Sequence, residues 1–100
     1  MTAEPARVEL VVRGSVQGVG FRYFAWREAL ALDLEGWVAN ERDGSVRCVA
    51  QGPRDRIEAF IAVLRAGPPA ALVTDVSERW GPPGGDLGPF AVRSGSHQGD

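Results

Sequence analysis

The spacing of apolar residues along this chain alternates between the two-residue period of a strand and the 3.6-residue period of a helix. Val8, Leu10 and Val12 show the first period near the start of the chain. From Ile57 onward, apolar side chains recur at i, i+3, i+4 and i+7, which is the second period. The order in which these two patterns follow one another limits the possible folds more than any other feature of the sequence.

The patterns predict two helices and five strands. Asp43-Gly44 is a turn signal between two of the strands, which we therefore expect to form an antiparallel hairpin. Pro53 suits the first turn of a helix, and Gly67, followed by two prolines, ends that helix. In chain order the predicted elements are a strand over 7–13, a helix over 21–32, strands over 37–40 and 45–51, a helix over 53–66, and strands over 72–80 and 90–93.

This β-α-β-β-α-β order, with one short extra strand, predicts an α+β fold of the ferredoxin-like type, in which two helices cover one face of an antiparallel sheet. One hundred residues leave room for one domain. We place it at residues 7–93, between a flexible N-terminus (1–6) and a flexible C-terminal tail (94–100). Enzymes, RNA-binding modules and regulatory ligand-binding domains share this fold, so the function has to be inferred from particular residues.

The composition removes several classes of function. All 11 basic residues are arginine, which excludes a P-loop or Schiff-base lysine, and the net charge of -2 argues against general nucleic-acid binding. Cys48, the only cysteine, lies in an apolar strand pattern and is predicted to be buried. His97, the only histidine, is predicted to be a disordered surface residue. The sequence shows neither a signal-peptide pattern nor a membrane-length apolar run, so we expect a soluble, cytoplasmic protein.

Residues 14–20, Gly-Ser-Val-Gln-Gly-Val-Gly, connect the first predicted strand to the first predicted helix, and we call them the glycine loop. Three glycines let successive backbone amides turn into one hollow, and the following helix adds its unpaired N–H groups. Such a loop favours an anion, most often phosphate, and Arg22 in the first helical turn is placed to clamp it. A Walker loop would need a lysine, and a dinucleotide fingerprint would need a glycine at Tyr23. The remaining alternative is a plain tight turn, for which one or two glycines would be enough.

Two segments together resemble the acylphosphatases, and the resemblance extends over about residues 7–93. The segments are Gly14-x-Val16-Gln17-Gly18-Val19-Gly20-Phe21-Arg22 and Gly36-Trp37-Val38-x-Asn40 followed by Asp43-Gly44-x-Val46. Taken singly, the arginine would be a solvated surface charge and the asparagine a turn former. Taken together with the glycine loop, they favour a site. The sequence departs from the family at Ser15, where relatives are often basic, and at Glu41, where they often carry a neutral residue.

The resemblance implies a metal-free, cofactor-free enzyme that hydrolyses acyl phosphates to a carboxylate and inorganic phosphate, and we expect it to be a monomer. Catalysis is assigned to Arg22, which also binds the phosphate, and to Asn40, which orients the attacking water. The remaining phosphate-binding residues are Ser15, Val16, Gln17, Gly18, Val19 and Gly20, through their amides. The alternative is a non-catalytic module that binds a small anionic metabolite. An RNA-binding module is disfavoured, because the strand over 45–51 carries no aromatic side chain.

Overall fold

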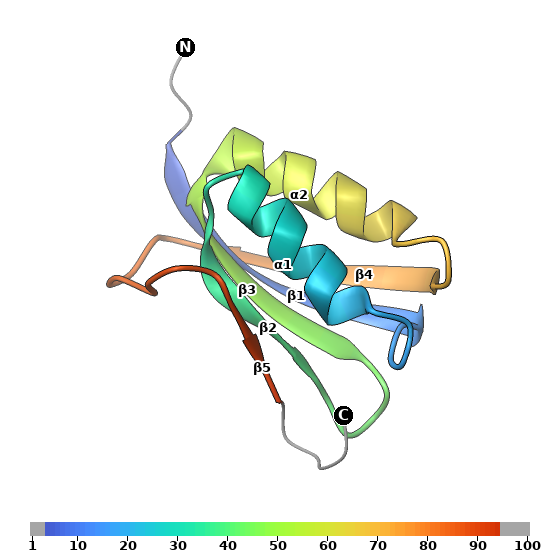
Figure 1. Ribbon diagram of the computed structural model, residues 1–100. Helices are drawn as coiled ribbons and strands as arrows, with labels where there is room; N and C mark the ends of the chain where they lie inside the picture. Colours follow the sequence, from blue (N-terminus) through green and yellow to red (C-terminus); the bar gives the residue numbers. More distant parts are fainter. Residues whose placement is uncertain (1–3, 95–100) are drawn as a thin grey trace.

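The computed structural model describes residues 4–94 and contains the seven predicted elements in the predicted order. Two helices lie against one face of a five-stranded sheet (Figure 1). The ferredoxin-like α+β fold is therefore confirmed. The elements are β1 (Pro5–Ser15), α1 (Phe21–Ala31), β2 (Glu35–Asn40), β3 (Val46–Pro53), α2 (Arg54–Ala66), β4 (Leu72–Gly81) and β5 (Ala91–Arg93).

The strands are arranged in the order β4-β1-β3-β2-β5. The first four strands of the chain pair antiparallel, and β2 and β3 form the hairpin expected around Asp43-Gly44. The short β5 instead runs parallel to β2, with Trp37 opposite Ala91 and Ala39 opposite Arg93. The sheet is thus mixed rather than wholly antiparallel, because the last strand is added to the outer edge of β2.

The first strand is longer at both ends than its apolar pattern predicts. Pro5 and Ala6 pair with the last residues of β3, so the flexible N-terminus expected for residues 1–6 is wrong at these two positions. At its other end β1 passes an irregularity after Arg13 and continues to Ser15. The added residues at the two ends of β1 are held by backbone pairing, and of Pro5, Ala6, Gly14 and Ser15 only Ala6 belongs to the hydrophobic core.

Two further expectations concern the chain ends and the start of α2. Residues 1–3 and 95–100 lie outside the described residues, and with them His97 and nearly all of the predicted tail. Pro53 is the N-cap of α2, with an extended backbone (φ -58°, ψ 134°), and still belongs to β3. The helix therefore begins at Arg54, one residue later than predicted.

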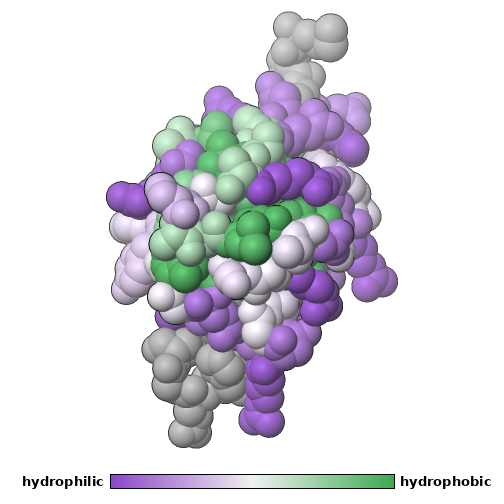
Figure 2. Space-filling model, turned by 90° about the vertical axis from the view of Figure 1, so that its right-hand side faces the viewer, coloured by the Kyte–Doolittle hydropathy of each residue, from purple (hydrophilic) through white to green (hydrophobic). Residues whose placement is uncertain are grey.

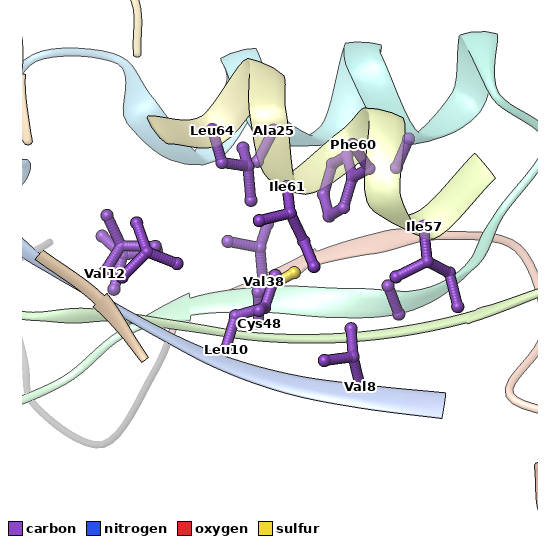
Figure 3. Close-up of a cluster of buried hydrophobic side chains, with 14 of the residues drawn as sticks. Val8, Leu10, Val12, Ala25, Val38, Cys48, Ile57, Phe60, Ile61 and Leu64 are labelled. Carbon is purple, nitrogen blue, oxygen red and sulfur yellow. The ribbon is translucent and has the colours of Figure 1, made fainter. Parts of the chain in front are cut away.

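The hydrophobic core fills the space between the sheet and the two helices (Figure 3). Cys48 is completely buried within it, as predicted, and burial raises the pKa of its thiol, which leaves it unreactive. Phe90 enters the same core edge-on to Phe60, at 5.8 Å between ring centroids, and its carbonyl accepts a hydrogen bond from the Trp26 indole at 3.1 Å. These contacts fix the segment that leads into β5.

Candidate active site

The part of the glycine loop that lies outside the strand, residues 16–20, joins the end of β1 to the start of α1. Gly18 and Gly20 have left-handed backbones, with φ of 75° and 79°, which residues with a side chain rarely adopt. A Cβ built on either glycine would meet no atom of residues 4–94 within 4 Å, so the loop is open there within the described part of the chain. Gly20 is also the N-cap of α1 and has no side chain with which to cap the N–H groups of this helix. The loop and the helix start therefore offer backbone donors to an anion.

Apolar side chains anchor the loop to the core. Val16 is buried, and Val19 packs partly against the core cluster. Ser15, predicted as a loop residue, is the last residue of β1 and pairs with Leu72 of β4. The loop is consequently held at both ends, and its open side carries the glycines.

The side chain of Gln17 ties the loop to the β2–β3 turn. Its Nε2 donates to the backbone carbonyl of Glu41 at 2.7 Å and to that of Ser45 at 3.0 Å. From the sequence, only the backbone amide of Gln17 is predicted to take part in the site, and the contacts of its side chain are not. The acceptors are backbone carbonyls, which every residue has, so the sequence gives no local signal for this contact.

Arg22 lies in the first turn of α1, as predicted, and reaches across to β5. Its Nη1 donates to the backbone carbonyl of Arg93 at 2.8 Å. The Arg93 guanidinium in turn stacks over the Trp37 ring of β2, 4.6 Å from its centroid. Arg93 was not among the predicted site residues, and its contribution to Arg22 is again through a backbone oxygen.

Asn40 is the last residue of β2 and is only 5% exposed. Because side chains alternate along a strand, it lies on the same side of the sheet as the core residue Val38, which is the helix side. Its Oδ1 is buried, and no donor among residues 4–94 forms a hydrogen bond to it. A buried acceptor without a partner is uncommon in proteins and is usually satisfied by a water or a ligand.

Two of these contacts bring the predicted site residues together around Asn40. Gln17 binds the carbonyl of Glu41, the residue directly after Asn40. Arg22 binds the carbonyl of Arg93, which is opposite Ala39, the residue directly before Asn40. The glycine loop, the arginine and the asparagine thus meet at one end of the sheet, which is the right-hand end in Figure 1.

The β2–β3 turn, which Gln17 grips, is itself well ordered by hydrogen bonds. The Asp43 carboxylate accepts from the backbone N–H of Ser45 at 2.9 Å, from its hydroxyl at 2.6 Å, and from Arg13 at 3.2 Å. The hydrogen bonds from Ser45, followed by the one from Arg13, lower the pKa of Asp43 from 3.8 to about 2. Glu41, the unusual residue of the motif, lines a shallow hollow with Arg13 and Arg47 on the sheet face away from the helices.

No group of three or more potential metal ligands (His, Cys, Asp or Glu) is found among residues 4–94. In the same range, neither helix is long and apolar enough to cross a membrane. The donors predicted for the site at this end of the molecule are backbone N–H groups, the Arg22 guanidinium and the Asn40 carboxamide. That set suits a tetrahedral oxyanion together with a water.

Comparison with known proteins identifies the family of this chain. The acylphosphatase family model matches residues 8–92. A curated acylphosphatase of Anaeromyxobacter sp. (strain Fw109-5) is 52% identical over 91 residues, which cover 91% of this chain and 98% of the relative. The crystal structure of acylphosphatase from Bacillus subtilis superposes with a TM-score of 0.86 at 36% identity, covering 88% of this chain and 98% of that one. The structure of an acylphosphatase from Coxiella burnetii superposes with a TM-score of 0.80 at 39% identity, covering 89% of this chain and 93% of that one. This chain therefore belongs to the acylphosphatase family.

Proposed function

We propose that this chain hydrolyses the carboxyl–phosphate bond of acyl phosphates, using the glycine loop and Arg22 to bind the phosphoryl group and Asn40 to place the attacking water. The products are a carboxylate and inorganic phosphate. An acyl phosphate is an activated anhydride, so its carboxylate leaves without a strong general acid. The protein has to bind, stabilise charge and orient a nucleophile.

Phosphate binding is supported by the donors that surround the open side of the loop. The amides of residues 15–20 would contact the phosphoryl oxygens, and the start of α1 adds its favourable dipole. Nη1 of the Arg22 guanidinium donates to the carbonyl of Arg93, and this contact helps to orient the side chain at the end of α1 that adjoins the glycine loop. A planar guanidinium fork suits the binding of phosphoryl oxygens and would stabilise the charge that develops on them.

The observation that carries the proposal is the buried Oδ1 of Asn40. This acceptor has no donor among residues 4–94. The next residue, Glu41, is bound by Gln17 of the glycine loop, and Arg22 binds Arg93, which is paired with the preceding residue, Ala39. A water held by Oδ1 would complete the hydrogen bonding of Asn40 and would lie beside the bound phosphoryl group. Its oxygen then forms the new bond to phosphorus as the bond to the acyl oxygen breaks.

The proton of the attacking water is proposed to pass to a phosphoryl oxygen. Cys48 is buried in the core, and burial raises the pKa of its thiol, so we assign it no role as a nucleophile. Glu41 borders the hollow on the other face of the sheet. We also propose that the reaction needs no metal or organic cofactor, and that the enzyme acts as a cytoplasmic monomer on small molecules, without nucleic acid or membrane.

The test is hydrolysis of benzoyl phosphate compared with phenyl phosphate, a monoester, with and without EDTA. We expect rapid release of benzoate and phosphate, little action on the monoester, and no loss of rate after exhaustive chelation. Tight binding of phosphate without turnover of any acyl phosphate would favour the non-catalytic module instead. A rate abolished by EDTA and restored by a divalent ion would contradict the metal-free mechanism.

A further inference from the structure

The connection between α2 and β4 has an unusual composition for a surface turn. Residues 66–72 read Ala-Gly-Pro-Pro-Ala-Ala-Leu and contain no polar side chain, although all of them are partly or fully exposed. Leu72 is 64% exposed, and is one of three large apolar side chains on the surface of the described chain. Scattered apolar residues are common on surfaces, but a continuous segment of this kind calls for an explanation. We call residues 66–72 the apolar collar.

The apolar collar lies directly against both ends of the glycine loop. At one end, Ser15 pairs with Leu72, and Gly14 is so close that a Cβ on it would lie 2.0 Å from the Leu72 carbonyl oxygen. At the other end, a Cβ on Gly67 would lie 3.7 Å from the ring of Phe21, the first residue of α1. Figure 2 looks onto this end of the molecule and shows apolar surface across its centre, with polar side chains around it.

The sheet order places the collar and Asn40 on opposite sides of the glycine loop. The loop follows β1, the collar precedes β4 on one side of β1, and Asn40 ends β2 on the other side, beyond β3. Figure 1 shows the same sequence at the right-hand end, where the β1–α1 connection lies between the α2–β4 turn and the β2–β3 turn. In phosphoryl transfer the attacking and leaving oxygens are roughly in line through phosphorus. If the water lies beside Asn40, the leaving carboxylate points toward the collar.

We infer that the apolar collar is the subsite for the acyl group, and that the enzyme prefers acyl phosphates with an aromatic or branched apolar acyl group. This inference rests on the proposed function. An apolar acyl group that covers Leu72 and the neighbouring prolines and alanines binds more favourably, because apolar surface on both sides is removed from water. A charged acyl group finds no counter-charge in residues 66–72 and must instead keep its own water. An acetyl group is too small to cover the collar.

The experiment measures kcat/KM for benzoyl, acetyl and succinyl phosphate with the wild type, Leu72→Ser and Leu30→Ser. Leu30 is a matched control, because it is also an exposed leucine (44%) and lies in the last turn of α1, at the far end from the loop. We expect Leu72→Ser to lower kcat/KM for benzoyl phosphate about three- to tenfold and to change kcat/KM for acetyl phosphate less than about twofold. Leu30→Ser should leave the benzoyl-to-acetyl ratio unchanged.

A second variant adds a charge in place of removing apolar surface. Leu72→Arg should raise the succinyl-to-acetyl ratio of kcat/KM, since the new guanidinium meets the free carboxylate of the succinyl group. Equal effects of Leu72→Ser on benzoyl and acetyl phosphate, or an unchanged succinyl-to-acetyl ratio in Leu72→Arg, would overturn the inference while the proposed function stands. A wild type that hydrolyses none of the three would overturn the proposed function itself. A wild-type dimer that Leu72→Ser dissociates in sedimentation velocity would assign the collar to a second copy of the chain and would also overturn the inference.

Discussion

Arg22 and Asn40 differ in charge, and that difference separates their expected contributions. If Arg22 clamps the phosphate as proposed, its permanent positive charge acts on the phosphate in the ground state and in the transition state alike. Asn40 is neutral, buried, and has an Oδ1 without a partner among residues 4–94. If its work is to orient a water, that work counts mainly in the transition state. Single substitutions at these two positions should therefore give different kinetic patterns.

We predict that Asn40→Ala lowers kcat about 10²-fold or more while KM and competitive inhibition by phosphate stay nearly unchanged. Arg22→Ala should damage kcat, KM and phosphate inhibition together, and Arg22→Lys should remain poor because an ammonium lacks the planar fork. Arg27→Ala, another arginine of α1 but exposed, is the control and should behave as wild type. Steady-state kinetics with benzoyl phosphate decide this. Normal turnover by Asn40→Asp would reduce Asn40 to a turn residue.

Part of the candidate site could be predicted from the sequence, because glycines, an arginine and an asparagine in a fixed spacing are informative residue types. The contacts that bring these residues together could not be predicted from the sequence. Gln17 and Arg22 each bind a backbone carbonyl in a distant segment, 24 and 71 residues away along the chain. Any residue supplies a carbonyl, so these partners depend on the sheet register, which is a property of the folded chain.

The contact between the glycine loop and the β2–β3 turn joins two elements through a single side chain. Gln17 Nε2 donates to two carbonyls, and each of these also accepts a backbone N–H within the turn, from Gly44 and from Glu41. The turn would keep its own hydrogen bonds if Gln17 were removed. The loop, in contrast, would lose both of these hydrogen bonds to the turn that follows Asn40.

We predict that Gln17→Met, which keeps the length of the side chain and removes its donors, lowers kcat about tenfold or more, in line with the cost of a misplaced catalytic group. Thermal stability should change little. A double-mutant cycle with Asn40→Ala provides the check: if Gln17 acts by positioning Asn40, the double variant should be no slower than Asn40→Ala alone. Fully additive effects on kcat would mean that Gln17 acts independently of Asn40.

Element order was easier to predict than element ends and directions. The apolar periods gave all seven elements, because the faces packed in the core have to be apolar. The direction of β5 was beyond the reach of the sequence, since a strand of three residues has the same pattern in either sense. It is fixed by neighbours instead, through Phe90 in the core and the stacking of Arg93 on Trp37.

For the molecule as a whole, ligand binding and stability are linked. A phosphate that binds only the folded chain stabilises it, and at ten times Kd the gain is about 1.4 kcal/mol, or about 5–10 °C in Tm for a domain of this size. We predict this shift for the wild type in differential scanning fluorimetry, with a similar effect of sulfate and with the shift lost in Arg22→Ala. An unchanged Tm at phosphate concentrations that fully inhibit hydrolysis would contradict a phosphate site in the glycine loop.

The two ends of the described chain lie at opposite ends of the strands, and this has a practical consequence. Pro5 is opposite Pro53, at the end of β1 far from the glycine loop, whereas Arg93 is opposite Ala39 and holds Arg22 through its carbonyl. An affinity tag, a surface tether or a fusion partner attached through Pro5 would extend from the end of the sheet that is far from the glycine loop. The same attachment made through Ser94 would be one residue from the contact with Arg22. Immobilised or fused forms of this enzyme should therefore be built from the N-terminal side, and a C-terminal attachment becomes a handle for perturbing activity deliberately.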